Sequence, residues 1–251
     1  MKLSIITVCY NSVRSLSNTI LSILQQKHRD FEYLVIDGNS KDGTQELLQY
    51  CEQFFDSRMR WVSEQDKGIY DAMNKGLALA SGEVIGFLNA DDVYRHPSVL
   101  NTIDSALTGH PEADAVHANI EFINERGVTT RRWAGREYRK GAFQRGWMPA
   151  HPTFYCRRKC FEQFGVFDCT AGSAADFELM LRFIEKHHIH THFIPENLVE
   201  MRLGGVSTAG VRSILRNTRL NQQAFRKNTI SCPWHYPLSR FLAKFQRSDA
   251  S

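Results

Sequence analysis

Short apolar runs alternate with longer amphipathic stretches over the first hundred residues. The short runs are predicted strands at Leu3–Cys9, Phe31–Asp37, Arg60–Glu64 and Glu83–Leu88. Apolar residues in the stretches between them recur every three or four positions, which predicts helices beginning near Val13, Thr44 and Ile69. Strands that alternate with helices of about ten to fifteen residues indicate an α/β fold with a mostly parallel, Rossmann-like sheet built from βαβ units.

The second half of the chain has a less regular pattern. Two neighbouring apolar runs predict a hairpin of Ala113–Phe122 with Val128–Trp133, and a shorter run predicts a strand at His151–Cys156. Amphipathic spacing predicts helices at Ala174–His187 and Val211–Lys227. A chain of 251 residues is long enough for one large domain with a substantial core.

The net charge of +4 is unevenly distributed along the chain. Residues 211–248 contain eight Lys and Arg and no Asp or Glu, whereas the rest of the chain is mildly acidic. Such a basic segment is either a solvated helix packed on the domain or a surface for a polyanion, such as an anionic membrane or a nucleic acid.

Three features of the sequence favour a cytoplasmic protein. The longest apolar runs are far shorter than the roughly 20 residues of a membrane-spanning helix. Met1 and Lys2 lead directly into a predicted strand, so we expect no signal peptide. The six cysteines include no CxxC pair, which favours reduced thiols over disulfides or a metal site.

Acidic residues follow two of the predicted parallel strands, where ligands of such sheets bind. Asp37 ends one strand, although by itself it is equally typical of a loop-starting residue that caps nearby amides. Asn89, Asp91 and Asp92 follow another strand, and their oxygens suit Mg²⁺ or Mn²⁺. A divalent ion there would neutralise charge on a departing diphosphate. The alternative is that these residues cap the helix expected after Pro97.

Two further polar residues occupy positions with an ordinary structural explanation. Asp176 lies in the first turn of a predicted helix, where the helix dipole favours an acidic side chain. His151 precedes a proline at the start of a predicted strand, and we treat it as a supporting residue.

Six sequence blocks carry these residues in collinear order over roughly residues 3–207. They are Ser4–Thr44, Glu64–Asp92 (EQDKGIYDAMNKGLALASGEVIGFLNADD), His151–Arg158 (HPTFYCRR), Gly165–Asp168, Ala174–Phe183 (AADFELMLRF) and Arg202–Ser207. Together they resemble glycosyltransferase family 2 enzymes of the GT-A fold. The resemblance implies one GT-A domain at residues 1–210, with a nucleotide-sugar-binding half at 1–112 and an acceptor-binding, catalytic half at 113–210. A basic helical extension would occupy residues 211–251.

The resemblance implies an inverting transfer of one sugar from a nucleotide-sugar to an acceptor hydroxyl, with Mn²⁺ or Mg²⁺ as cofactor. It implies that Asp176 is the catalytic base and that Asp91 and Asp92 bind the metal. It places six residues at the nucleotide-sugar: Thr7, Tyr10, Asp37, Asn74, Asn89 and Asp91. Many similar enzymes build bacterial surface polysaccharides on lipid-linked acceptors, so we expect a lipid-linked glycan and peripheral contact with the inner face of the cell membrane.

The chain departs from the family pattern at two positions. Asn89 stands first in the DxD-type motif and brings no negative charge. Met73 precedes Asn74, where many members carry an arginine. The cation that assists the diphosphate is then one of three residues, Lys67, Lys75 or Arg202, and the sequence does not choose among them.

Rival functions explain less of the pattern. A sugar nucleotidyltransferase would need a glycine-rich loop after the first strand, where this chain has Cys9-Tyr10-Asn11-Ser12. A Rossmann dehydrogenase would need GxGxxG, which follows none of the predicted strands. A non-catalytic sugar- or nucleic-acid-binding module would use the aromatic residues of the basic segment but leaves the acidic strand ends unexplained. We therefore expect no nucleic-acid partner.

Overall fold

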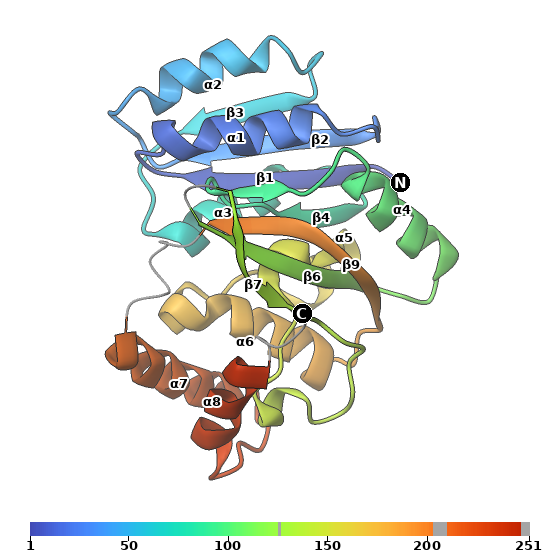
Figure 1. Cartoon of the computed structure of the whole chain (residues 1–251), viewed down its shortest axis with the longest axis vertical. Coiled ribbons are helices and arrows are strands. Elements are labelled where there is room, and N and C mark those ends of the chain that lie inside the picture. Colours follow the sequence, from blue (N-terminus) through green and yellow to red (C-terminus); the bar gives the residue numbers. More distant parts are fainter. Residues whose placement is uncertain (125–126, 203–209, 247–251) are drawn as a thin grey trace.

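Four parallel strands from the first hundred residues form one half of the sheet (Figure 1). The computed structural model describes residues 1–124, 127–202 and 210–246. The four strands are β1 (Leu3–Cys9), β2 (Phe31–Asp37), β3 (Met59–Ser63) and β4 (Val84–Phe87), in the order β3-β2-β1-β4. Every residue of β1, β2 and β4 is buried, because helices cover both faces of this part of the sheet.

The other half of the sheet mixes parallel and antiparallel strands. They are β5 (Asp92–Tyr94), β6 (Ala115–Ile123), β7 (Thr129–Trp133), β8 (Tyr155–Arg157) and β9 (Thr191–Arg202). Strand β8 runs antiparallel between β4 and β6, β9 runs parallel to β6, and β5 is antiparallel to β9. The predicted hairpin is confirmed, since β6 and β7 pair antiparallel. The sheet is thus parallel throughout in its amino-terminal half and mixed beyond β4.

Strands β8 and β9 differ from the sequence prediction. The expected strand at His151–Cys156 starts instead with a 3₁₀ turn at His151–Thr153, and the ladder of β8 begins only at Tyr155. Pro152 explains the difference, because proline has no N–H to donate within a sheet. The long strand β9 is missing from the prediction, since Pro195 interrupts its apolar pattern.

Eight helices surround the sheet in the described part of the chain. They are α1 (Val13–Leu24), α2 (Thr44–Glu52), α3 (Ile69–Leu79), α4 (Val99–Gly109), α5 (Arg158–Phe164), α6 (Ala175–Leu181), α7 (Gly210–Lys227) and α8 (Tyr236–Gln246). A π-helical turn at Arg182–Lys186 prolongs α6, and together they form the predicted amphipathic helix. Within the described ranges no helix combines the length and apolar character needed to cross a bilayer.

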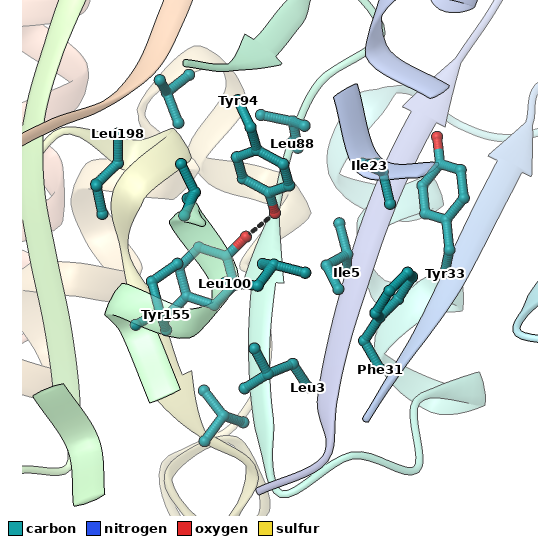
Figure 2. Close-up of a cluster of buried hydrophobic side chains, with 14 of the residues drawn as sticks. Leu3, Ile5, Ile23, Phe31, Tyr33, Leu88, Tyr94, Leu100, Tyr155 and Leu198 are labelled. Carbon is teal, nitrogen blue, oxygen red and sulfur yellow. Dashed lines mark hydrogen bonds between the residues drawn. The ribbon is translucent and has the colours of Figure 1, made fainter. Parts of the chain in front are cut away.

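Two apolar clusters fill the opposite faces of the sheet. Successive residues of β1 point to opposite faces, so Leu3 enters one cluster and Ile6 the other. Figure 2 shows part of the first cluster, where the hydroxyl groups of Tyr94 and Tyr155 are hydrogen-bonded to each other. Gly86 of β4 makes room for the Tyr155 ring, which a Cβ atom at that position would overlap. This packing fixes β4, β5 and β8 relative to one another.

The basic carboxyl-terminal segment is packed into the second cluster. Phe225 of α7 and Tyr236 of α8 are fully buried, with ring centroids 5.1 Å apart, and both contact Phe177 of α6. The Asn228 amide donates a hydrogen bond to Glu178 over 3.0 Å. Residues after 210 therefore contribute to the core, although the sequence predicted an extension beyond a domain that ends at 210.

Candidate active site

The carboxyl ends of β1, β2 and β4 meet at one edge of the sheet. Cys9 at the end of β1 pairs with Asp37 at the end of β2, and β4 lies on the other side of β1. The Thr7 hydroxyl donates a hydrogen bond of 2.7 Å to the Leu88 carbonyl and is fully buried. Thr7 therefore ties β1 to the chain leaving β4, and its side chain is engaged inside the protein.

Asp37 is a fully buried carboxylate whose oxygens are already bonded within the protein. It accepts hydrogen bonds from the Ser40 amide at 3.0 Å and the Ser63 hydroxyl at 2.6 Å, and a further one from the Ser40 hydroxyl. These bonds shape the loop of residues 38–43. Asp37 thus holds that loop in place, and its contact with a nucleoside is an expectation that the structure does not test.

Tyr10 is an exposed aromatic residue at the same edge. Its ring lies beside Gly38, where a Cβ atom would come within 3.2 Å of Tyr10 Cδ2 and 2.7 Å of Asp66 Oδ2. Glycine therefore permits the close approach of these three residues. The exposed ring offers a flat apolar face of the kind on which aromatic groups stack.

The loop after β4 contains side-chain oxygens without partners. Asn89 Oδ1 and Asp92 Oδ2 are both buried and accept no hydrogen bond from the described residues. Burial raises the pKa of Asp92 well above its usual value, the charge of Asp91 adds to this, and the Asn89 side chain opposes it. Burial also raises the pKa of half-buried Asp91, which the charge of Arg202 lowers. Unpaired buried acceptors are costly, so these two oxygens are available to a hydrogen-bond donor or a cation.

The oxygens of this loop fit a hard divalent cation. Two carboxylates and one amide are ligands suited to Mg²⁺ or Mn²⁺, whose remaining positions water or phosphate oxygens would fill. Among the residues that the structure describes, no group of three or more His, Cys, Asp or Glu is arranged to hold a metal. The described residues therefore supply no complete metal site by themselves.

Of the three candidate cations, Arg202 at the end of β9 is the one whose charge acts on Asp91. Lys75 is engaged elsewhere, because its Nζ lies 2.8 Å from Glu64 Oε1 and donates to the Gln65 carbonyl. Residues 203–209, which complete the last of the six sequence blocks, lie outside the described residues.

Asn74 forms a link between α3 and the segment before α6. Its Nδ2 donates to the Phe167 carbonyl at 2.9 Å, and its Oδ1 accepts from the Phe167 amide at 3.0 Å. Both ends of the amide are thus used to hold Phe167. The structure places Asn74 in this clamp, and no described contact connects it with Asp37 or Asp91.

Asp176 is half-buried in the first turn of α6, where its Oδ1 accepts a hydrogen bond of 2.7 Å from the Phe177 amide. Its charge acts on two neighbouring rings. Burial raises the pKa of Tyr70, and Asp176 raises it further. Burial lowers the pKa of His151, an effect that Asp176 opposes. Tyr70 and His151 thus face the candidate base.

His151 connects the candidate base to the loop after β4. Its ring stacks on that of Phe87, the last residue of β4, with centroids 5.9 Å apart, and its Nε2 is buried without a partner among the described residues. His151 thus contacts the strand that precedes Asn89, Asp91 and Asp92, and the charge of Asp176 acts on the same ring. Tyr70 is not among the residues predicted from the sequence, where its only signal is its position at the start of α3.

The fold and the site define an α/β protein that receives a polar ligand beyond the carboxyl ends of its parallel strands. Its sequence is more specific, since residues 4–187 match the family model described as glycosyl transferase family 2, and the chain belongs to this family. An uncharacterized glycosyltransferase of Mycobacterium tuberculosis is 33% identical over 183 residues, which cover 71% of this chain and 67% of the relative. Membership makes the protein a glycosyltransferase and disfavours the nucleotidyltransferase and binding-module alternatives.

Solved structures have the same fold. Staphylococcus aureus TarS 1–349 in complex with UDP-GlcNAc matches with a TM-score of 0.73 and 19% identity, over 99% of this chain and 74% of that one. This chain spans 44% of the longer TarS chain. The mannosyltransferase PcManGT of Pyrobaculum calidifontis, in complex with GDP-Man and Mn²⁺, matches with a TM-score of 0.64 and 18% identity, over 99% and 75%. The expected GT-A architecture is confirmed.

Proposed function

We propose that the protein transfers one sugar from a nucleotide-sugar to an acceptor hydroxyl, with inversion at the anomeric carbon and with Mn²⁺ or Mg²⁺ bound. The observation that carries the proposal is the pair of partnerless oxygens on Asn89 and Asp92, which follow β4. His151 stacks on Phe87, the last residue of that strand, and the charge of Asp176 acts on His151. A metal-dependent transfer needs both a cation site and a base near one strand end. Complexes of similar folds with UDP-GlcNAc, and with GDP-Man and Mn²⁺, support the donor class and the metal.

The donor would lie across the edge formed by β1, β2 and β4. Tyr10 offers a stacking face for the base, beside the loop that Asp37 holds. Asn89, Asp91 and Asp92 would hold the metal, which neutralises charge on the diphosphate when bound. Arg202 supplies a second positive charge next to Asp91.

Asp176 would remove the proton from the acceptor hydroxyl. A hydroxyl is a weak nucleophile near neutral pH, so a carboxylate that takes its proton speeds the attack by about 10²–10⁴-fold. Inversion follows if the hydroxyl attacks from the face opposite the departing diphosphate. Burial keeps His151 neutral near pH 7, so it can line the site without competing as a cation.

The acceptor in this proposal is a lipid-linked glycan at the inner face of the bacterial cell membrane, in surface-polysaccharide biosynthesis. The basic character of residues 211–248 supports a location at an anionic surface.

The decisive test replaces Asp176 with Asn, which keeps the size of the side chain and removes its basicity. A panel of nucleotide-sugars with Mn²⁺, screened by thermal stabilisation, first identifies the donor. We then expect Asp176→Asn to lower kcat by about 10²–10⁴-fold while donor affinity stays nearly unchanged.

The matched control is Glu46→Gln, which alters the first-turn acid of α2 at the other end of the molecule. It reports the effect of losing a charge at a helix start, which is a few tenths to about 1 kcal/mol of stability. Near-wild-type turnover of Asp176→Asn would remove Asp176 from the role of base and leave it as a helix-start residue.

A further inference from the structure

One face of helix α8 exposes large apolar side chains to solvent. Leu238 and Leu242 are one helical turn apart and 60% and 50% exposed, and Phe241 beside them is also exposed. Trp234, just before the helix, is 91% exposed. Single exposed apolar residues are common, but four within nine positions form a patch of the kind that marks an interaction site.

The opposite face of α8 fixes the helix to the domain. Tyr236 is buried against Phe177 and Phe225, and the backbone of Arg240 lies so close to Gly146 that a Cβ atom there would meet the Arg240 Cα at 2.6 Å. The outer face is therefore presented on a packed helix.

The surroundings of this patch are strongly basic. Residues 211–248 contain eight Lys and Arg and no Asp or Glu. Arg216, Arg219 and Arg226 of α7 are exposed. Helices α7 and α8 lie together at one end of the molecule, opposite α2 and β3 (Figure 1). The apolar patch and the positive charge thus share one end of the protein.

An anionic bilayer satisfies both features at once. Apolar side chains of an amphipathic helix enter the boundary between head groups and acyl chains, while Lys and Arg are attracted to anionic lipids. A second copy of the chain would bring another cluster of positive charges against the first, which repels.

We propose that the outer face of α8, formed by Trp234, Leu238, Phe241 and Leu242, inserts into the surface of an anionic bilayer. The insertion itself does not depend on the proposed function. Only its consequence, access to a lipid-linked acceptor, rests on that function. The Arg240 side chain lies on the other side of α8, where its guanidinium donates a hydrogen bond to the Thr218 hydroxyl of α7 over 3.3 Å.

Point substitutions on the full chain test the proposal, because truncation would remove Tyr236 from the core. The variant Leu238→Ser/Leu242→Ser changes only exposed positions. The wild-type protein should bind mixed vesicles of phosphatidylcholine and phosphatidylglycerol. It should bind vesicles of phosphatidylcholine alone much more weakly. We expect the double variant to lose about tenfold or more in binding to the mixed vesicles, measured by co-sedimentation, because the buried apolar area is lost.

The matched control is Leu21→Ser/Leu79→Ser, which changes two comparably exposed leucines of α1 and α3 and should bind like wild type. The fluorescence of Trp234 gives a second readout. Its emission should shift to the blue on mixed vesicles, and Trp234→Phe should abolish that shift. Added salt should weaken binding of the wild type.

Equal binding of the wild type and the Leu238→Ser/Leu242→Ser variant overturns the proposal, and so does absence of binding to mixed vesicles. A dimer that this variant dissociates, with no vesicle binding, would make the face an interface between copies instead. None of these measurements involves a nucleotide-sugar, so a failure of the Asp176→Asn test leaves the membrane result standing, and the converse also holds.

Discussion

The loops after β2 and β4 occupy equivalent places in the fold but differ in the hydrogen bonding of their buried carboxylates. Both follow fully buried parallel strands on either side of β1. Asp37 accepts hydrogen bonds from Ser40 and Ser63, whereas Asp92 Oδ2 and Asn89 Oδ1 have no partner in the described chain. The hydrogen bonds of the first loop are complete within the protein, whereas the second loop leaves two buried acceptors without a partner.

The local supply of donors explains the difference. Two serines lie within reach of Asp37, and both of them donate to its oxygens. Near the other loop, the Thr19 hydroxyl donates to the Asp92 backbone carbonyl at 2.8 Å, and Asp92 Oδ2 has no partner among the described residues. The chain also enters β5 at once, so no intervening loop supplies further amides. A buried acid that lacks donors is therefore the better marker of a cation site.

The largest expected effect comes from the incomplete loop. Asp91→Asn removes the half-buried charge that would bind the cation, so we expect turnover with Mn²⁺ to fall by about 10³-fold or more, since metal stabilisation of a diphosphate is worth several kcal/mol. Mn²⁺-dependent binding of nucleoside diphosphate, followed calorimetrically, should disappear as well. Unchanged turnover of this variant in EDTA would show that Asp91 binds no catalytic metal.

A smaller effect, on stability, should come from the complete loop. Asp37→Asn replaces one acceptor oxygen with an amide that faces the Ser40 N–H, and we expect the free energy of unfolding to fall by about 1–3 kcal/mol. Urea unfolding measures this directly. Because the proposed metal ligands lie in the other loop, Mn²⁺ binding should persist in Asp37→Asn. If Asp37→Asn loses metal binding and keeps its stability, the loop after β2 binds the metal and the roles given to the two loops are wrong.

An effect of similar size, but dependent on pH, concerns Glu32 of β2, another buried and satisfied carboxylate. Burial alone would raise its pKa, but hydrogen bonds from Ser4 and Ser81 lower the pKa to about 2, below the ordinary 4.5. A folded pKa below the unfolded one means that Glu32 stabilises the protein above about pH 4.5 and that this contribution is lost as the pH falls toward 2.

Glu32→Gln should therefore make the free energy of unfolding depend less on pH below about 4.5. Near pH 6 it should lower the free energy of unfolding by about 1–3 kcal/mol. Chemical unfolding at several pH values measures both quantities. If the profiles of wild type and variant stay parallel between pH 6 and about 3, the hydrogen bonds do not favour the charged form.

The sequence by itself determined the parallel half of the sheet and the position of the polar strand ends. Runs such as Leu3–Cys9 are buried along their whole length, so local composition alone identifies them. The acidic residues after β2 and β4 then fall at the carboxyl edge because parallel strands share it. The six sequence blocks that resemble glycosyltransferase family 2 could also be identified from the sequence, because each is a local segment and their order is fixed.

Tertiary structure alone decided which of these polar groups remain unsatisfied. Asn74 and Phe167 are 93 residues apart, and only the folded chain shows that the Asn74 amide holds the Phe167 backbone; its expected contact with the nucleotide-sugar stays a prediction. Tyr236, expected on a basic extension, is buried beside Phe225, which leaves Leu238 and Trp234 outside. The hydrogen bonding and burial of a side chain depend on neighbours that are distant in sequence. A local sequence pattern predicts only the average environment of a segment.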